Sequence, residues 1–178
     1  MRNKVAEAFL EDCSSELEKI VAIVTLSEGS VCAKEVNAVR VESLSFLTKY
    51  ALIKACGTIE LCFKTIISER VTEKESVLVK KYLEETFLSR GINPKIKAIS
   101  SHLSKFDEAW PKQFEDKIAA KDNKISSSMR YLVDERNKHA HGQDTRIGLH
   151  EVIECFGRGR NAIEILDEVV SDLPVTLS

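Results

Sequence analysis

Apolar residues recur every three or four positions along most of this chain, which is the spacing of one face of an α-helix. The first such segment runs from Ala6 to about Glu28-Gly29, with charged residues between the apolar positions. The second, from about Val41 to Ser68, is apolar around most of its circumference. We therefore expect an amphipathic first helix, followed by the most buried helix of the molecule.

The rest of the chain continues the helical pattern with one interruption. The further predicted elements are helices over residues 72–90, 93–106, 125–141 and about 149–172. Residues 107–123 are predicted to be less regular, a loop with a helical turn or two. Gly91 is expected to close one helix in the left-handed conformation, and Gly142 to stop another. Because no alternation of period two persists, we predict an all-α protein. It forms one domain, residues 1–178, as an antiparallel bundle of four to five helices with an irregular insertion at about 91–124.

Charge is distributed unevenly over this predicted bundle. The chain has 178 residues, of which 43% are hydrophobic and 30% charged, and its net charge is −2. Such a surface does not attract nucleic acid as a whole. Its cations gather in the last third, at Arg130, Arg136, Lys138, Arg146, Arg158 and Arg160. Any contact with nucleic acid must therefore be local.

The sequence also bears on the compartment. Charged residues from Arg2 onward leave no room for the apolar core of a signal peptide, and no apolar stretch approaches the roughly 20 residues that cross a bilayer. The five cysteines are widely spaced and lie mostly in apolar helical patterns: Cys13, Cys32, Cys56, Cys62 and Cys155. They are interpreted as reduced core residues. We expect a cytoplasmic protein without a membrane partner.

An arginine near the end of a predicted helix interrupts an apolar row. Arg136 follows Met129 and Leu132 at offsets of seven and four residues, which bring side chains to nearly one helix face. One interpretation is structural: the methylenes of Arg136 pack on the core, and the guanidinium pairs with Asp134 or Glu135 at the surface. The alternative is that the guanidinium is held there to bind an anion.

Two more polar side chains converge on the same helix end. Asn137 and His141 are four residues apart and share a face beside Arg136, and His141 falls in the last turn. A histidine there also interacts favourably with the helix dipole, without any chemical role. His139 and His141 point to different faces, and no third ligand is placed by the sequence. We expect neither a metal nor a cofactor.

The segment from Tyr131 to Gly142, YLVDERNKHAHG, resembles the signature helix of HEPN domains. In that signature an Arg is followed by a polar residue and then by a His, and here four residues separate Arg136 from His141. The order of helices fits as well, and the nearest branch is the RiboL-PSP-HEPN group. The resemblance implies a metal-independent endoribonuclease. It would act as a homodimer, with two motifs lining one cleft, and leave 2′,3′-cyclic phosphate and 5′-hydroxyl ends.

The same resemblance assigns roles to individual residues. Arg136 would clamp the phosphate and His141 would act as general base or acid. Asn137 would orient one of them, and His139 is a weaker candidate for a second contact. Family analogy also suggests a carboxylate at Glu60 that braces the motif arginine.

Two positions weigh against parts of this assignment. Glu60 can instead form a surface pair with Lys64 at i and i+4, worth a few tenths of a kcal/mol. HEPN toxins silenced by an antitoxin nucleotidyltransferase commonly carry a Tyr two residues after the motif His, where this chain has Gln143. Control by nucleotide transfer to that tyrosine is therefore not expected.

The resemblance to HEPN domains implies an RNA-cleaving homodimer in phage defence or a toxin–antitoxin system, with a regulatory or antitoxin partner. One alternative, favoured by the net negative charge, is a non-catalytic HEPN module that dimerises and binds a nucleotide, RNA or a protein. Another is an unrelated helical bundle with a chance motif. Cleavage of RNA without divalent metal separates the first two hypotheses.

Overall fold

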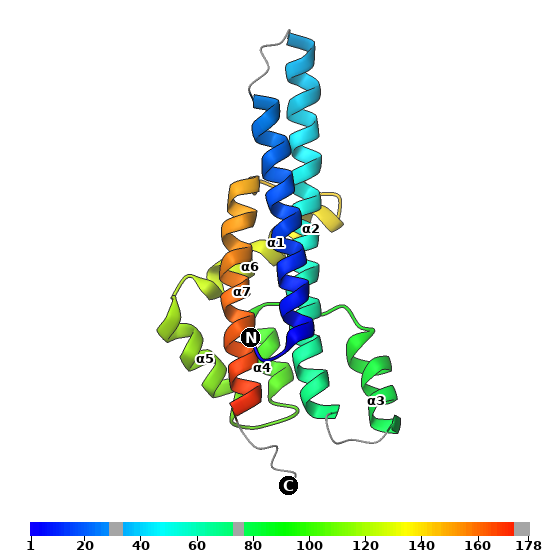
Figure 1. Ribbon diagram of the computed structural model, residues 1–178, viewed down its shortest axis with the longest axis vertical. Coiled ribbons are helices and arrows are strands. Elements are labelled where there is room, and N and C mark those ends of the chain that lie inside the picture. The colour runs from blue at the N-terminus through cyan, green and yellow to red at the C-terminus, as the bar shows by residue number, and fades with distance from the viewer. Residues whose placement is uncertain (29–33, 73–76, 173–178) are drawn as a thin grey trace.

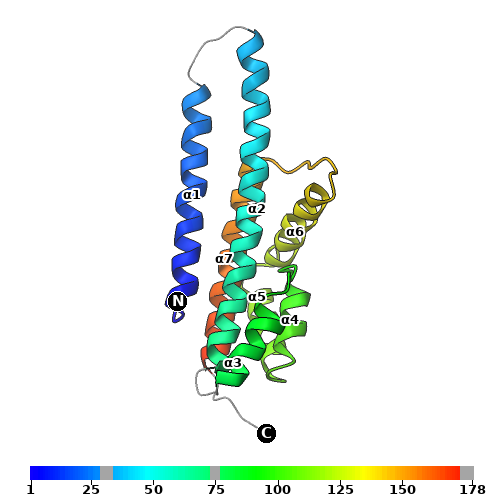
Figure 2. The same ribbon diagram turned by 90° about the vertical axis from the view of Figure 1, so that its right-hand side faces the viewer.

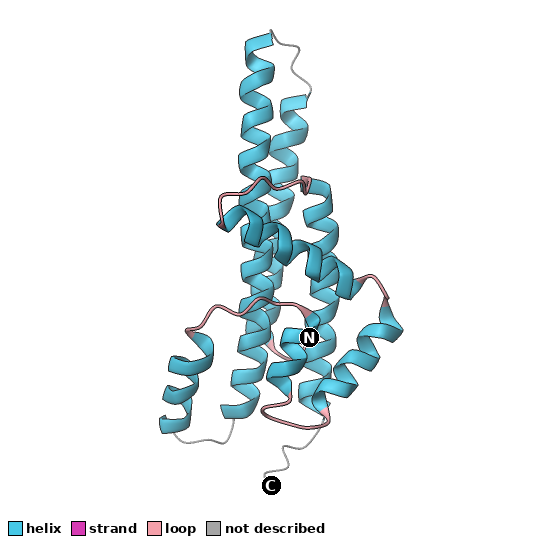
Figure 3. Ribbon diagram, turned by 180° about the vertical axis from the view of Figure 1, so that it is seen from behind, coloured by secondary structure: helices cyan, strands magenta, loops and turns pink. Residues whose placement is uncertain are grey.

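The computed structural model describes residues 1–28, 34–72 and 77–172, and its regular structure in these ranges is entirely helical. Three long helices lie side by side: α1 (Lys4–Glu28), α2 (Lys34–Thr72) and α7 (Leu149–Asp172) (Figure 1). The motif helix α6 (Ile125–Ala140) crosses α2 and α7 on the side away from α1 (Figures 2 and 3). The predicted all-α bundle is confirmed.

Close packing between α2 and α7 forms the platform for the motif helix. Gly159 of α7 lies so near Ile59 of α2 that a Cβ atom at position 159 would overlap the Ile59 side chain. A larger residue at position 159 would require the Ile59 side chain to shift in the close-packed core. On the other side of this platform, α6 buries Met129, Leu132 and Val133. The apolar stripe of α6 therefore fixes which of its faces remains accessible.

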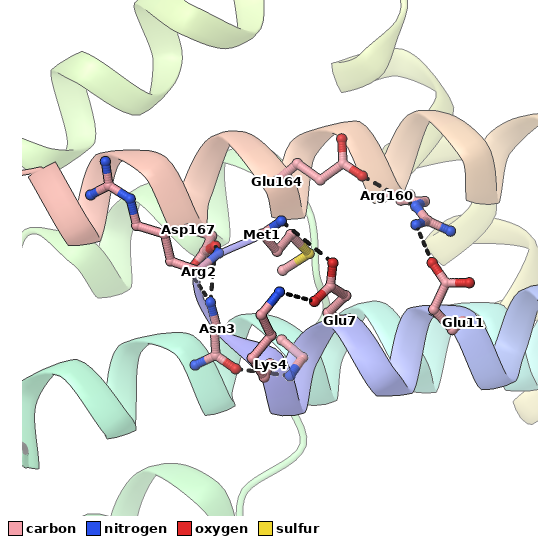
Figure 4. Close-up of polar contacts among 10 residues, drawn as sticks. Met1, Arg2, Asn3, Lys4, Glu7, Glu11, Arg160, Glu164 and Asp167 are labelled. Carbon is pink, nitrogen blue, oxygen red and sulfur yellow. Dashed lines mark hydrogen bonds and ion pairs between the residues drawn. The ribbon is translucent and has the colours of Figure 1, made fainter.

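Polar contacts fasten the start of the chain to α7 (Figure 4). Asp167, which is buried, accepts hydrogen bonds from the backbone amides of Arg2 at 2.5 Å and Asn3 at 3.2 Å. About two turns earlier on α7, Arg160 contacts Glu11 of α1 at 2.5 Å and Glu164 of its own helix at 3.2 Å. These contacts set the register of α1 along α7.

The segment predicted to be irregular, residues 107–123, contains a regular helix. This helix, α5 (Trp110–Lys121), packs against the short helix α4 (Ile96–Leu103) and against α7. Asp107, which precedes the helix, accepts the backbone amides of Ala109 at 2.7 Å and Trp110 at 3.1 Å and so satisfies donors at its first turn. The prediction was wrong because only three apolar side chains, at positions 110, 114 and 118, are buried in a polar stretch.

Other predicted boundaries also shift. α2 extends beyond the predicted range of 41–68 at both ends, and Thr72 ends it instead of starting the next helix. The start predicted for the third helix falls in part on residues 73–76, outside the described residues. The next helix in the described part of the chain is α3 (Val77–Leu83), continued by the π-helix η1 (Glu84–Leu88).

Gly91 does not close the third helix in the left-handed conformation. Gly142 is the one residue in the described ranges with a positive φ, 70°. The end of η1 is secured instead by the buried Lys64 of α2, whose Nζ donates to the backbone carbonyls of Leu88, at 3.4 Å, and Arg90. A side chain from another helix therefore replaces the expected glycine cap.

Four cysteines are free and buried, as predicted: Cys13, Cys56, Cys62 and Cys155. The fifth, Cys32, lies outside the described residues. Within the described ranges, no helix combines the length and apolar character needed to cross a membrane.

Candidate functional site

The motif helix ends in a tight turn that fixes the position of His141. The amide of Gly142 donates to the carbonyl of His139 at 3.0 Å, and that of Gln143 to the carbonyl of Lys138 at 2.9 Å. These two bonds and the positive φ of Gly142 make a Schellman motif, in which glycine avoids the steric cost of the left-handed conformation. His141 is the last residue before this glycine, so its exposed side chain stands at the end of α6.

Arg136, five residues earlier, is half-buried and forms a hydrogen bond with a residue outside its own helix. Its Nη2 donates to Oδ1 of Asn93 at 2.8 Å, while its Nε is buried without a hydrogen-bond partner. The guanidinium also lies near the thiol of Cys56. Burial raises the pKa of that thiol to about 12, and Arg136 counteracts this only in part, so Cys56 stays protonated. Most N–H groups of Arg136 are therefore not engaged by the described protein.

The other predicted site residues lie at the same end of α6. Asn137 and His139 are half-buried and His141 is exposed. The structure gives none of these three side chains a hydrogen bond within the described ranges. The end of α6 thus presents one guanidinium, one amide and two imidazoles whose polar atoms can meet a ligand.

The surface ion pairs considered for Arg136 do not form. Asp134 pairs with Lys95 at 2.6 Å, and Glu135 pairs with Lys138 at 2.5 Å. Both carboxylates are engaged elsewhere, and the charge of Arg136 is not neutralised by a neighbouring carboxylate on its own helix. This favours the interpretation in which the guanidinium binds an anion.

Glu135 is a supporting residue that the sequence analysis missed. It is 2% exposed, and besides Lys138 it accepts the backbone amide of Arg146 at 2.8 Å. Burial alone would raise its pKa, but the hydrogen bonds from Lys138 and from the amides of Arg146 and Ile147 outweigh it and lower the pKa. Glu135 therefore fastens the loop after His141 back onto α6. Nothing in the sequence distinguishes it from a surface acid.

Glu60 lies on α2 near the motif but does not contact Arg136 in the structure. Its Oε1 accepts Nζ of Lys64 at 2.6 Å and the backbone amide of Ile92 at 2.8 Å. The alternative pair with Lys64 forms, yet it is not a surface pair, because the Lys64 side chain is 7% exposed. Asn93, the neighbour of Ile92 in the chain, accepts a hydrogen bond from Arg136.

Some of the cations expected near the motif are engaged elsewhere. Arg158 pairs with Glu154 at 2.7 Å and with Asp122 at 3.3 Å, and Arg160 is held by two glutamates, one on α1 and one on α7. Arg146 in the loop after α6 is exposed and its side chain has no such partner in the described ranges. Among the expected cations, Arg130, Arg136 and Arg146 therefore have no ion-pair partner in the described ranges.

This constellation differs from a metal centre. Within the described residues, no group of three or more His, Cys, Asp or Glu side chains is placed to hold a metal ion. Arginine guanidinium groups bind phosphates through paired N–H donors, and an imidazole can move a proton. The last turns of α6 thus carry a group that can bind phosphate and groups that can transfer a proton.

Comparisons with known proteins give one match. The family model described as RiboL-PSP-HEPN matches residues 8–172, which include α1 from residue 8 onward and the whole of α2, α6 and α7. Searches of the curated proteins and of the solved structures gave no significant match.

Proposed function

The chain belongs to the RiboL-PSP-HEPN family, which supports a nuclease or RNA-binding module in general, and on that premise we propose that it is a metal-independent endoribonuclease. The substrate is RNA, and the active form is a homodimer. One observation carries the proposal: a single exposed helix end presents the unneutralised guanidinium of Arg136 and the free imidazole of His141.

RNA supplies its own nucleophile, so an imidazole and a guanidinium are the kinds of side chain that this cleavage requires. His141 of one chain removes the proton of a 2′-hydroxyl, whose oxygen attacks the adjacent phosphorus. The bond to the 5′-oxygen breaks, and a second imidazole, from the other copy of the chain, protonates that oxygen. Arg136 stabilises the charge that accumulates on the phosphoryl oxygens. The products are a 2′,3′-cyclic phosphate and a 5′-hydroxyl. Asn137 and His139 would make further contacts at this site.

An exposed apolar face on α2 supports the homodimer. Phe46, Tyr50 and Ile53 are separated by four and three residues and are 62%, 50% and 50% exposed. They form one face of the helix. Ile53 is about one turn from Cys56, and Cys56 lies next to Arg136 of the motif. A second copy on this face would bury apolar area and bring two motif ends towards each other.

The biological setting is inferred from the proposed chemistry. A ribonuclease of this kind would act in the cytoplasm, in phage defence or in a toxin–antitoxin system, under a regulatory or antitoxin partner. Because Gln143 stands where a modifiable tyrosine would be needed, that partner would act by binding.

The test is incubation of purified protein with mixed RNA in EDTA, and then mass spectrometry of the fragment ends. Arg136→Ala and His141→Ala should each abolish cleavage. Matched controls are Arg130→Ala, an exposed arginine of the same helix, and His150→Ala, an exposed histidine of α7, which should cleave like the wild type. RNA bound but not cut by the wild type would favour the non-catalytic module, and His141→Ala cleaving at the wild-type rate would refute the assignment.

A further inference from the structure

A connecting segment, residues 88–95, runs from the last residue of η1 to the residue before α4 and is held against α2. Lys64 donates to the carbonyls of Leu88 and Arg90, and Glu60 accepts the amide of Ile92. Lys64 and Glu60 also pair with each other at 2.6 Å, one turn apart on α2. Three backbone positions of this connecting segment are therefore fixed to one partly buried ion pair.

The same connecting segment is attached to the motif helix at its other end. Asn93 accepts Nη2 of Arg136 at 2.8 Å, and Lys95 pairs with Asp134 of α6 at 2.6 Å. Asn93 comes immediately after Ile92, the residue that Glu60 holds. An unbroken series of contacts thus runs from Glu60 on α2, through the connecting segment, to the guanidinium of Arg136.

We propose that Asn93 is a positioning residue that orients Arg136 towards the bound phosphate, and that the Glu60–Lys64 pair fixes Asn93. The catalytic consequence of this inference rests on the proposed function. The carboxylate that family analogy suggested as a direct brace for the arginine acts here through the connecting segment. Asn93 itself was not a candidate in the sequence.

The chemical type of Asn93 explains its use at this position. A free arginine side chain samples many rotamers, and one hydrogen bond to a terminal nitrogen selects among them. A carboxylate would select equally well but would also neutralise the guanidinium and compete with the phosphate. The neutral amide oxygen of Asn93 orients Arg136 while leaving its charge and its remaining donors to the ligand.

Two substitutions at one exposed position separate these effects. Asn93→Ala removes the acceptor, and Asn93→Asp keeps it but adds a negative charge. Asn93 is exposed, so neither change should unfold the chain, and Asn123→Ala is a matched control because Asn123 is also exposed and its side chain has no hydrogen bond in the described ranges. All variants are made in the full chain.

The first readout is independent of activity. Nitrogen-15 NMR of the arginine side chains, with Arg136 assigned by its loss in Arg136→Lys, reports how fast its guanidinium rotates. Rotation should accelerate severalfold in Asn93→Ala, and stay slow in Asn93→Asp and Asn123→Ala. Unchanged rotation in Asn93→Ala would overturn the inference, whatever the cleavage assay shows.

The second readout is RNA cleavage without metal. Loss of a hydrogen bond to a charged group predicts a decrease of about tenfold in kcat/KM for Asn93→Ala. Asn93→Asp should instead raise KM with little change in kcat, because Arg136 stays oriented but attracts phosphate less. A wild type that neither binds nor cuts RNA would refute the proposed function, and NMR would still decide whether Asn93 orients Arg136. Cleavage by Asn93→Ala at the wild-type rate would refute the positioning role.

Discussion

At the scale of single residues, the charged groups around the motif differ mainly in how deeply they are buried. Lys64 and Glu135 are almost entirely enclosed, whereas His141 and Arg146 are exposed. Enclosed charges need partners, because an unpaired charge away from water costs several kcal/mol. Exposed ones remain available for a ligand. The enclosed pairs therefore fix the backbone, and the exposed groups are available to contact a ligand.

Replacing Glu60 by Gln tests the first enclosed pair. The variant keeps an oxygen for the amide of Ile92 but leaves the charge of Lys64 unpaired, so the free energy of unfolding should fall by about 3 kcal/mol. Urea denaturation measures this change. The double variant Glu60→Gln/Lys64→Met removes both charges and should recover part of the loss. A double variant less stable than Glu60→Gln alone would contradict the explanation.

Glu135 predicts a specific pH dependence. Since its pKa in the folded protein lies below the ordinary value of 4.5, its stabilising effect is complete above that value and is lost as the pH falls through the lower, folded pKa. Glu135→Gln should lower the free energy of unfolding at neutral pH by about 1–3 kcal/mol, because the one oxygen of a Gln side chain cannot accept from both Lys138 and the backbone amide of Arg146. The difference between wild type and variant should shrink below about pH 4.5. A difference that grows on acidification would refute this account.

At the scale of helices, the ends of the elements matter more than their interiors. α6 stops where Gly142 takes a positive φ, and the Schellman bonds place His141 at that stop. The end of η1 has no such glycine and is held by Lys64 from another helix. The first kind of helix end is determined by the local sequence, while the second depends on the tertiary fold.

Gly142→Ala should therefore destabilise the chain by about 1 kcal/mol through backbone strain alone, because a Cβ there meets no atom within 4 Å. The strain should also displace His141 and reduce RNA cleavage. The matched control is Gly157→Ala in the middle of α7, where a Cβ also meets nothing and alanine should stabilise by about 0.5–1 kcal/mol. Thermal unfolding of both variants gives the comparison, and shifts of the same sign would disprove it.

The long helices and the motif helix could be predicted because their signals are local and repetitive: apolar residues every three or four positions, and a glycine after His141. α5 was missed, although its sequence contains a local signal for a helix. Asp107 can accept amides at the helix start, and Trp110 and Phe114 are four residues apart. The role of Asn93 could not have been found, because it is 43 residues from Arg136 and their contact exists only in the folded chain.

At the scale of the whole molecule, the protein is asymmetric in what it leaves exposed. On α2, Ala51, Leu52 and Ala55 are buried in the core, whereas Phe46, Tyr50 and Ile53 on another face of the same segment are about half exposed or more. The second helix was predicted to be apolar around most of its circumference, and part of that apolar surface is therefore left exposed. With a net charge of −2, electrostatic repulsion between copies is small. An apolar helix face on a nearly neutral protein favours self-association.

Ile53→Asp should therefore convert a homodimer into a monomer, because a carboxylate in the centre of an apolar interface loses its hydration without gaining a partner. Light scattering after size-exclusion chromatography measures the mass, and circular dichroism confirms that the helices persist. Leu78→Asp is the matched control, since Leu78 is 79% exposed but lies on α3, away from this face, and that variant should remain dimeric.

If two copies complete the active site, Ile53→Asp should lose RNA cleavage together with dimerisation, while keeping Arg136 and His141 intact. A monomeric variant that cuts RNA at the wild-type rate would show that one chain suffices, and an unchanged mass would place the interface elsewhere.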